Sequence, residues 1–270
     1  MLEKIKKNKF WIALFIIFAI RMILVSCQQP VILYFAGNDD AHVFSMAERL
    51  LDMDWLGPYT SMTLSKGIFA SVFIAIANVI GIPFLTAEHI FYAIACLTLV
   101  LVLRKKIIKN DAISCGLFAI LMFNPVLYCT ELCRVYRDYI NSSLLIFLVA
   151  SLFGLFLNYK EKWTKLIKYM VGIGLSFTCM YLPIIAISIL MTVLFILLDK
   201  ECLDKVKKII LYIIPVAIFG IIIIIICSLN RYAYGLFTLN QYSGKTWNNL
   251  LDALYSVKVE KEYNHVPVSK

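Results

Sequence analysis

The stretch FWIALFIIFAIRMILVSC (residues 10–27) decides the fold, because Arg21 is its only charged residue. At about 1.5 Å per residue, a helix of this length reaches roughly 27 Å, which is enough to cross the hydrocarbon core of a bilayer. The rest of the chain has the same character: 61% of its 270 residues are hydrophobic, 16% are charged and the mean hydropathy is +0.84. Soluble domains are less apolar and more charged. The sequence therefore excludes a water-soluble globule and predicts an all-α integral membrane protein.

Further apolar runs have the length of membrane-spanning helices if the long run 169–198 is broken near Tyr181 into an in-and-out pair. The predicted crossings are residues 10–27, 88–103, 113–128, 140–159, 169–181, 182–198 and 209–229. They leave a short N-terminal segment (1–9), a long first external loop (28–87) and a C-terminal tail (230–270) outside the membrane. We therefore expect a polytopic protein with about seven transmembrane helices.

The basic residues give this layout an orientation. Four clusters of Lys and Arg flank the crossings, within residues 4–9, 104–109, 160–168 and 200–208. With a cytoplasmic N-terminus, all four clusters lie inside and hold sixteen of the 26 Lys and Arg residues, as the positive-inside rule requires. The net charge of +9 is then a consequence of topology and does not indicate a nucleic-acid partner. The expected location is the cell membrane, with several crossings and the N-terminus in the cytoplasm.

Two segments allow a second interpretation. Residues 67–84 are apolar enough to cross, but a crossing there would put the 104–109 cluster outside, so we expect this run to dip into the outer leaflet. The first run also resembles a cleaved signal, because Leu24-Val25-Ser26-Cys27 has the form of a lipoprotein cleavage box. Arg21 disfavours cleavage, since a charge so deep in the apolar region of a signal is unfavourable.

Acidic residues open the first external loop. Asp39 and Asp40 precede a predicted amphipathic surface helix over 40–54, in which Val43, Met46, Ala47 and Leu50 recur at helical spacing. One interpretation is that the two carboxylates only cap this helix. The other is that one is a general base and its neighbour orients it, or that the pair holds a divalent cation such as Mg or Mn, which prefer oxygen ligands.

Three cations are candidates for binding an anion. Lys66 either anchors the start of the helix that follows it or faces a phosphate. Arg134 and Arg137 are three residues apart, which would put them on one face of a helix and let them grip a phosphate as two forks. Glu131 and Asp138 lie within one turn of Arg134, so pairing among these residues is the purely structural alternative.

Several short segments occur in an order that resembles a known family. The chain is similar to the bacterial integral-membrane glycosyltransferases of the GT-C superfamily, relatives of protein O-mannosyltransferases, lipid A aminoarabinose transferases and rhizobial lipopolysaccharide galacturonosyltransferases. The matching segments are Asp39-Asp40, Trp55-Leu56-Gly57-Pro58-Tyr59, Thr63-Leu64-Ser65-Lys66-Gly67, Asn124-Pro125 and Arg134-Val135-Tyr136-Arg137-Asp138, with a further likeness over residues 253–270. Members of that family continue past the position of Lys270, so the resemblance implies a truncated member.

The resemblance implies that a sugar moves from a polyprenyl-phosphate carrier in the membrane to a glycan, lipid or protein acceptor on the outer face. It makes Asp39 and Asp40 the base and its neighbour, and it puts Lys66, Arg134 and Arg137 near the lipid phosphate. Two other classes stay open: a non-catalytic membrane partner in a cell-envelope glycan pathway, and a transporter of lipids or solutes.

Overall fold

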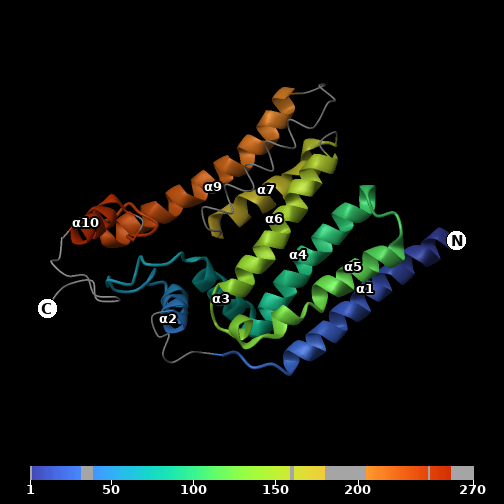
Figure 1. The fold of residues 1–270 in the computed structure, drawn as a ribbon, viewed down its shortest axis with the longest axis horizontal. Coiled ribbons are helices and arrows are strands. Elements are labelled where there is room, and N and C mark those ends of the chain that lie inside the picture. The colour runs from blue at the N-terminus through green and yellow to red at the C-terminus, as the bar shows by residue number, and fades with distance from the viewer. Residues whose placement is uncertain (1, 32–38, 159–160, 180–204, 243, 257–270) are drawn as a thin grey trace.

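A computed structural model describes residues 2–31, 39–158, 161–179, 205–242 and 244–256 (Figure 1). Over these residues the chain forms helices and turns, together with one isolated bridge between Val31 and Arg134. Segments of five helices are long and apolar enough to cross a membrane: Lys9–Ser26, Phe84–Lys106, Asp111–Tyr128, Asp138–Asn158 and Ile213–Tyr234. The protein is thus an all-α, membrane-embedded chain.

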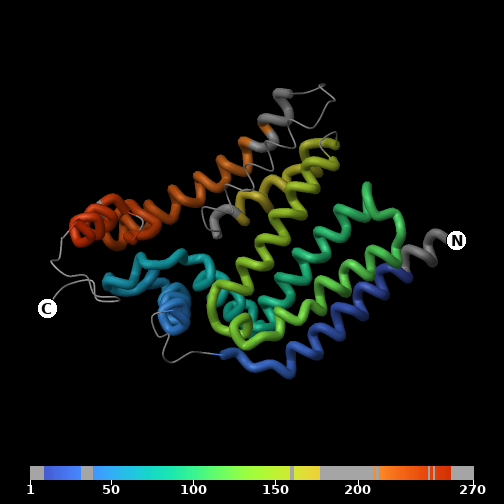
Figure 2. The backbone as a smooth tube through the Cα atoms, viewed as in Figure 1, coloured from blue at the N-terminus to red at the C-terminus, as the bar shows by residue number. Residues whose placement is uncertain are grey.

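Among the described residues, several helices lie side by side in one bundle (Figure 2). They are α1 (Leu2–Ser26), α4 (Phe84–Lys106), α5 (Asp111–Met122), α6 (Asp138–Asn158), α7 (Trp163–Cys179) and α9 (Lys205–Tyr234). Helix α1 packs against α4 and α5, α4 packs against α6, and α7 joins α6 to α9. Helices α6, α7 and α9 therefore pack in chain order, whereas α5 lies beside α1 and α4 (Figure 1).

The helix boundaries differ in places from the predicted ones. Helix α4 begins at Phe84 rather than at 88, because Pro83 holds the N-cap position and fixes where the helix starts. The last apolar segment extends to Tyr234 rather than to 229. The predicted crossing 169–181 overlaps α7, which has 17 residues. The predicted crossing 182–198 lies outside the described residues.

One end of the bundle carries basic residues. At this basic end, Arg104 pairs with Asp111 at 2.7 Å between α4 and α5, and Lys105 pairs with Glu161 at 3.1 Å after α6. The guanidinium of Arg104 also lies 4.1 Å from the ring centre of Phe10 in α1. The beginning of α1, the end of α4 and the start of α5 therefore meet here, and α7 and α9 both begin on the same side (Figure 1).

The opposite end, the loop end, is built from short helices. Helix α2 (Asp40–Leu51) buries Val43, Met46 and Ala47 in a core shared with α3 (Phe69–Ile80) and α6. It ends before the predicted residue 54, because Met53 and Trp55 have φ of 58° and 33°, which no α-helix contains. Helix α3 has 12 residues and a length of about 18 Å, too short to cross a bilayer. Its insertion into the outer leaflet stays a prediction.

The segment that follows α9 is tied to the first loop. The side-chain amide of Asn240 donates to the carbonyl of Ser65 at 2.9 Å, and the backbone N–H of Gln241 donates to the carbonyl of Leu64 at 3.0 Å. The hydroxyl of Tyr234 donates to the carbonyl of Gly57 at 2.8 Å. The chain then forms α10 (Lys245–Tyr255). These bonds fix the backbone on the N-terminal side of Lys66.

Candidate functional site

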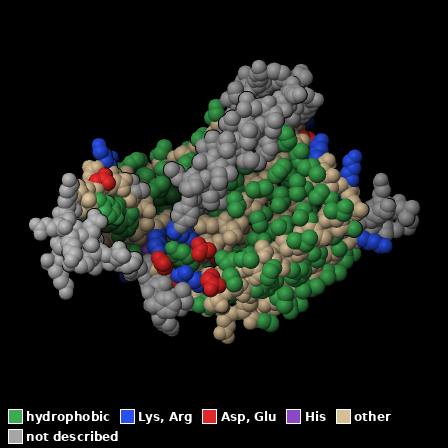
Figure 3. All heavy atoms as spheres, viewed as in Figure 1, with side chains coloured by type: hydrophobic (Ala, Val, Ile, Leu, Met, Phe, Trp, Pro, Cys, Tyr) green, Lys and Arg blue, Asp and Glu red, His purple; other side chains and the backbone are tan. Residues whose placement is uncertain are grey.

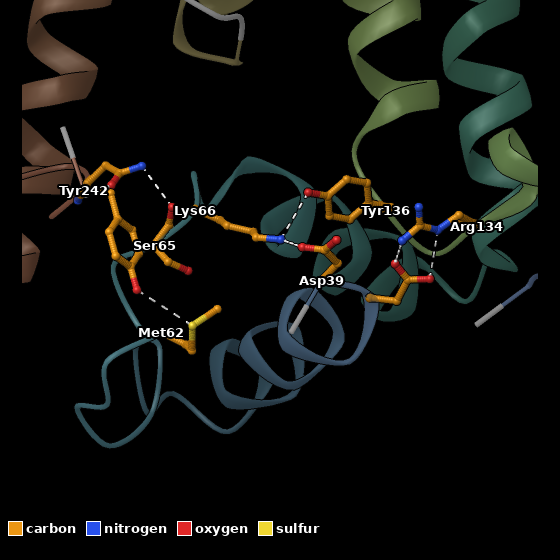
Figure 4. Close-up of polar contacts among 9 residues, drawn as sticks. Asp39, Met62, Ser65, Lys66, Arg134, Tyr136 and Tyr242 are labelled. Carbon is orange, nitrogen blue, oxygen red and sulfur yellow. Dashed lines mark hydrogen bonds and ion pairs between the residues drawn. The ribbon is translucent and has the colours of Figure 1, made fainter. Parts of the chain in front are cut away.

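The two neighbouring aspartates at the start of α2 have different surroundings. Asp39 occupies the N-cap position, but its side chain makes no capping hydrogen bond. Instead its carboxylate forms an ion pair with Lys66 (Figure 4). The Asp39 side chain is 42% exposed, whereas that of Lys66 is only 14% exposed. The capping interpretation is therefore wrong for Asp39, whose carboxylate faces a cation and the solvent.

Asp40 is held by Arg134. The guanidinium donates from Nε to Oδ2 at 3.1 Å and from Nη2 to Oδ1, in the two-pronged geometry that makes Arg–carboxylate pairs strong. The Asp40 side chain is fully buried. The hydrogen bond to Asp40 raises the pKa of Arg134 above its usual value. Both oxygens of Asp40 are thus engaged, and this carboxylate fixes the position of Arg134.

The arginine pair does not lie on one helix, which corrects the expectation from spacing: Arg134 is extended, and Arg137 directly precedes α6. The preceding short helix ends at Cys133, and Arg134 has φ −69° and ψ 147°. The reason is backbone pairing with Val31, which donates to the carbonyl of Cys133 at 2.9 Å and accepts from the N–H of Val135 at 3.2 Å. Arg134 pairs with the distant Asp40 rather than with the nearby Glu131.

Tyr136 lies at the centre of the site. The centre of its ring is 5.0 Å from Nζ of Lys66, 5.1 Å from Cζ of Arg134 and 5.2 Å from Cζ of Arg137. Nζ of Lys66 also donates to the Tyr136 hydroxyl at 3.2 Å. An aromatic face attracts cations, so one ring holds three positive groups together. No role of its own was predicted for Tyr136, although its place between Arg134 and Arg137 was a signal.

The charges of the site favour binding of an anion. Three cations and the two carboxylates Asp39 and Asp40 gather around Tyr136 at the loop end, and Figure 3 shows acidic and basic side chains next to the hydrophobic surface of the helices. Burial lowers the pKa of Lys66, and the positive charges of Arg137 and Arg134 lower it further. An incoming anion relieves this repulsion among the cations.

The site does not suit a dedicated divalent cation. Among the described residues, no group of three or more His, Cys, Asp or Glu side chains comes together. The oxygens of Asp40 are bound by Arg134, and the carboxylate of Asp39 is bound by Lys66. Asp39 and Asp40 are the two metal ligands that the sequence suggested. A Mg or Mn ion would have to displace Lys66 and Arg134 from these carboxylates.

A second polar cluster lies between the membrane-spanning helices. Nε of Arg21 in α1 donates to Nδ1 of His89 in α4 at 3.0 Å, and Nη2 donates to the hydroxyl of Tyr139 in α6 at 3.0 Å. All three side chains are buried. From the sequence, Arg21 was only an indication against a signal peptide. Ionisable residues inside apolar runs were the signal for this cluster.

Comparisons of the chain with protein-family models, with characterised proteins and with solved structures found no match. The class of protein is therefore defined by fold and site alone. It is an all-helical membrane protein with a cation-rich, carboxylate-bearing site where its first loop meets the start of α6.

Proposed function

We propose that this protein is a glycosyltransferase that moves a sugar from a polyprenyl-phosphate donor in the cell membrane to a glycan, lipid or protein acceptor on the outer face. The observation that carries the proposal is the gathering of Asp39, Lys66, Arg134 and Arg137 around Tyr136, next to membrane-spanning helices. Such a reaction needs a base for the acceptor and cations for the departing phosphate, in reach of both lipid and water.

The proposal includes an orientation and the seven-crossing, GT-C-like layout. The N-terminus and the basic end lie in the cytoplasm, where the positive-inside rule puts clusters of Lys and Arg. The grouping of Arg104 and Lys105 at that end supports this orientation. The loop end then faces the outside, where a sugar linked to polyprenyl phosphate meets its acceptor.

The different surroundings of the two aspartates assign their roles. Asp39 is the general base, because its side chain is 42% exposed and an acceptor hydroxyl can reach it. Asp40 is a positioning residue that acts through Arg134. Lys66, Arg134 and Arg137 stabilise the negative charge of the phosphate that leaves.

The transfer step balances without a metal or an oxidant. The oxygen of the acceptor hydroxyl attacks the anomeric carbon of the donor sugar and forms the new C–O bond. The bond between that carbon and the phosphate oxygen breaks, and its electron pair stays on the polyprenyl phosphate. The carboxylate of Asp39 takes the proton of the hydroxyl and later releases it to water.

The ion pair between Lys66 and Asp39 links donor binding to the base. A phosphate competes with Asp39 for the ammonium group of Lys66. When Lys66 turns to the phosphate, Asp39 loses its paired cation, and a carboxylate without a cation has a higher affinity for a proton. Binding of the donor therefore activates the base, and Asp39 stays unreactive while no donor is present.

Mass spectrometry of surface glycans tests the proposal. A strain that lacks the gene is complemented with the native protein, with Asp39→Asn or with the control Asp54→Asn, at matched expression. Asp54 is an exposed carboxylate paired with Arg49, so the control alters a similar ion pair away from Tyr136. We expect the native protein and the control to restore a missing sugar and Asp39→Asn to fail. Full restoration by Asp39→Asn, or a deletion strain with unchanged glycans, would overturn the proposal.

A further inference from the structure

The buried cluster of Arg21, His89 and Tyr139 has a defined direction of hydrogen bonding. An arginine N–H can only donate, so Nδ1 of His89 accepts from Nε of Arg21 and carries no proton. The imidazole is therefore neutral, with its proton on Nε2. Nη2 of Arg21 lies 2.5 Å from the same Nδ1 and donates to the hydroxyl of Tyr139 at 3.0 Å, and the oxygen of Tyr139 stands 2.7 Å from Nδ1. The donors of Arg21 thus go to two neutral acceptors.

Glu88, the neighbour of His89 on α4, is left without such a donor. Its side chain is fully buried, and neither carboxylate oxygen has a hydrogen-bond partner among the described residues. Nη1 of Arg21 and the hydroxyl of Tyr128 are also buried with no partner in the described chain. The carboxyl lies close enough to the Cys133 thiol and to Tyr139 to act on both electrostatically.

We propose that Glu88 is a proton-binding site that holds its proton as a neutral acid in this arrangement. An ionised carboxylate buried without donors costs several kcal/mol, whereas the neutral acid avoids most of this cost. Arg21 meanwhile stacks on Tyr128, with its Cζ 4.1 Å from the ring centre, which offsets part of the cost of burying its charge.

The proton site lies directly beside the segment that carries the two arginines. Cys133 precedes Arg134, and Tyr139 follows Arg137 by two residues. The groups in electrostatic reach of Glu88 are Cys133 of the 3-10 turns and Tyr139 of α6. Its chain neighbour His89 and Tyr139 contact Arg21 of α1, which also lies over the ring of Tyr128.

Infrared spectroscopy of the purified full-length chain tests the proposal directly. A protonated carboxylic acid has a carbonyl-stretch band that a carboxylate lacks. At neutral pH we expect this band in the native protein, its loss in Glu88→Gln, and its retention in Glu48→Gln, which changes an exposed carboxylate of α2. Identical spectra for the native protein and Glu88→Gln would overturn the proposal. Because no sugar transfer is measured, this result is independent of the proposed enzyme activity.

A second variant tests the role of Arg21. A nearby positive charge favours ionisation of a carboxylic acid, so in Arg21→Gln the Glu88 band should persist to higher pH than in the native protein. A band that disappears at the same or lower pH would show that the charge of Arg21 does not act on this carboxyl, and would assign the band to another acid. Circular dichroism checks the helix content of each variant. Should Glu88→Gln fail to fold, Glu88→Asp keeps the acid and must shift the band if the band belongs to this residue.

Discussion

Asp39 and Asp40 show how one helix start gives two identical residues different tasks. Successive residues of a helix point about 100° apart, so Asp40 faces the core while Asp39 faces Lys66 and water. The sequence could single out this pair as candidates but could not predict which member is accessible. That distinction depends on where Arg134 lies, and Arg134 is 94 residues away in the chain.

Substitution of each aspartate by asparagine should separate the structural role of Asp40 from the chemical role proposed for Asp39. Asp40→Asn breaks a buried charge pair and leaves Arg134 without its counter-ion, so we expect a loss of about 3–5 kcal/mol in the free energy of unfolding. Asp39→Asn removes a half-exposed pair and should cost about 1 kcal/mol or less. Thermal unfolding in detergent measures both. A larger loss for Asp39→Asn would contradict the buried position of Asp40.

The pH dependence of donor binding should report Lys66. Its ammonium group must be protonated to hold a phosphate, and its pKa is lowered by burial and by the two arginines. Affinity for a polyprenyl phosphate should therefore begin to fall at a lower pH than for an ordinary lysine. Lys66→Arg keeps its charge at all accessible pH values, so we expect it to abolish this alkaline loss. If the affinity of Lys66→Arg falls at the same alkaline pH as that of the native protein, the fall is caused by another group.

At the scale of elements, apolar periodicity predicted that a helix exists but not where it ends. The apolar spacing of Val43, Met46 and Ala47 indicated α2, and these residues are its buried face. The end of α2 could not be predicted, because Met53 and Trp55 adopt positive φ without being glycines. The extended segment at Arg134 was missed for a related reason. Its conformation depends on pairing with Val31, a contact that local spacing does not contain.

The contact between α7 and α9 should be sensitive to one methyl group. A Cβ added at Gly174 would lie 2.9 Å from Cβ of Ile218 and 3.1 Å from the carbonyl oxygen of Pro215, whereas one added at Gly220 would meet nothing within 4 Å. We expect Gly174→Ala to cost about 1–3 kcal/mol and Gly220→Ala to be neutral or slightly stabilising. Thermal unfolding of the two variants compares them. Equal stabilities would mean that the two helices separate easily.

The segment after α9 should stabilise the loop that carries Lys66. Asn240→Ala removes the hydrogen bond to the carbonyl of Ser65, and one such bond contributes about 1 kcal/mol. Faster hydrogen exchange is expected in residues 57–66, with no change in α6. Asn248→Ala, an exposed position on α10, is the matched control. Unchanged exchange in Asn240→Ala would show that the loop is held without this contact.

For the whole molecule, hydropathy predicted helices but not which of their faces are buried. Lipid is as apolar as a protein core, so hydrophobicity does not separate the two environments. The structure illustrates this, since Phe15 is 68% exposed while Arg21 on the same helix is 0% exposed. The polar residues inside apolar runs were the better guide to the interior. They mark where α1, α4 and α6 meet.

The orientation of the molecule can be tested through cysteines. Cys27 is exposed just after α1, at the loop end, and Lys109 is exposed at the basic end. In a chain whose other cysteines are changed to serine, a membrane-impermeant maleimide should label Cys27 in intact cells. With Cys27 also changed to serine, Lys109→Cys should react only after permeabilisation. The reverse pattern would put the charged site in the cytoplasm, where an acceptor on the outer face cannot reach Asp39, and would exclude the proposed reaction.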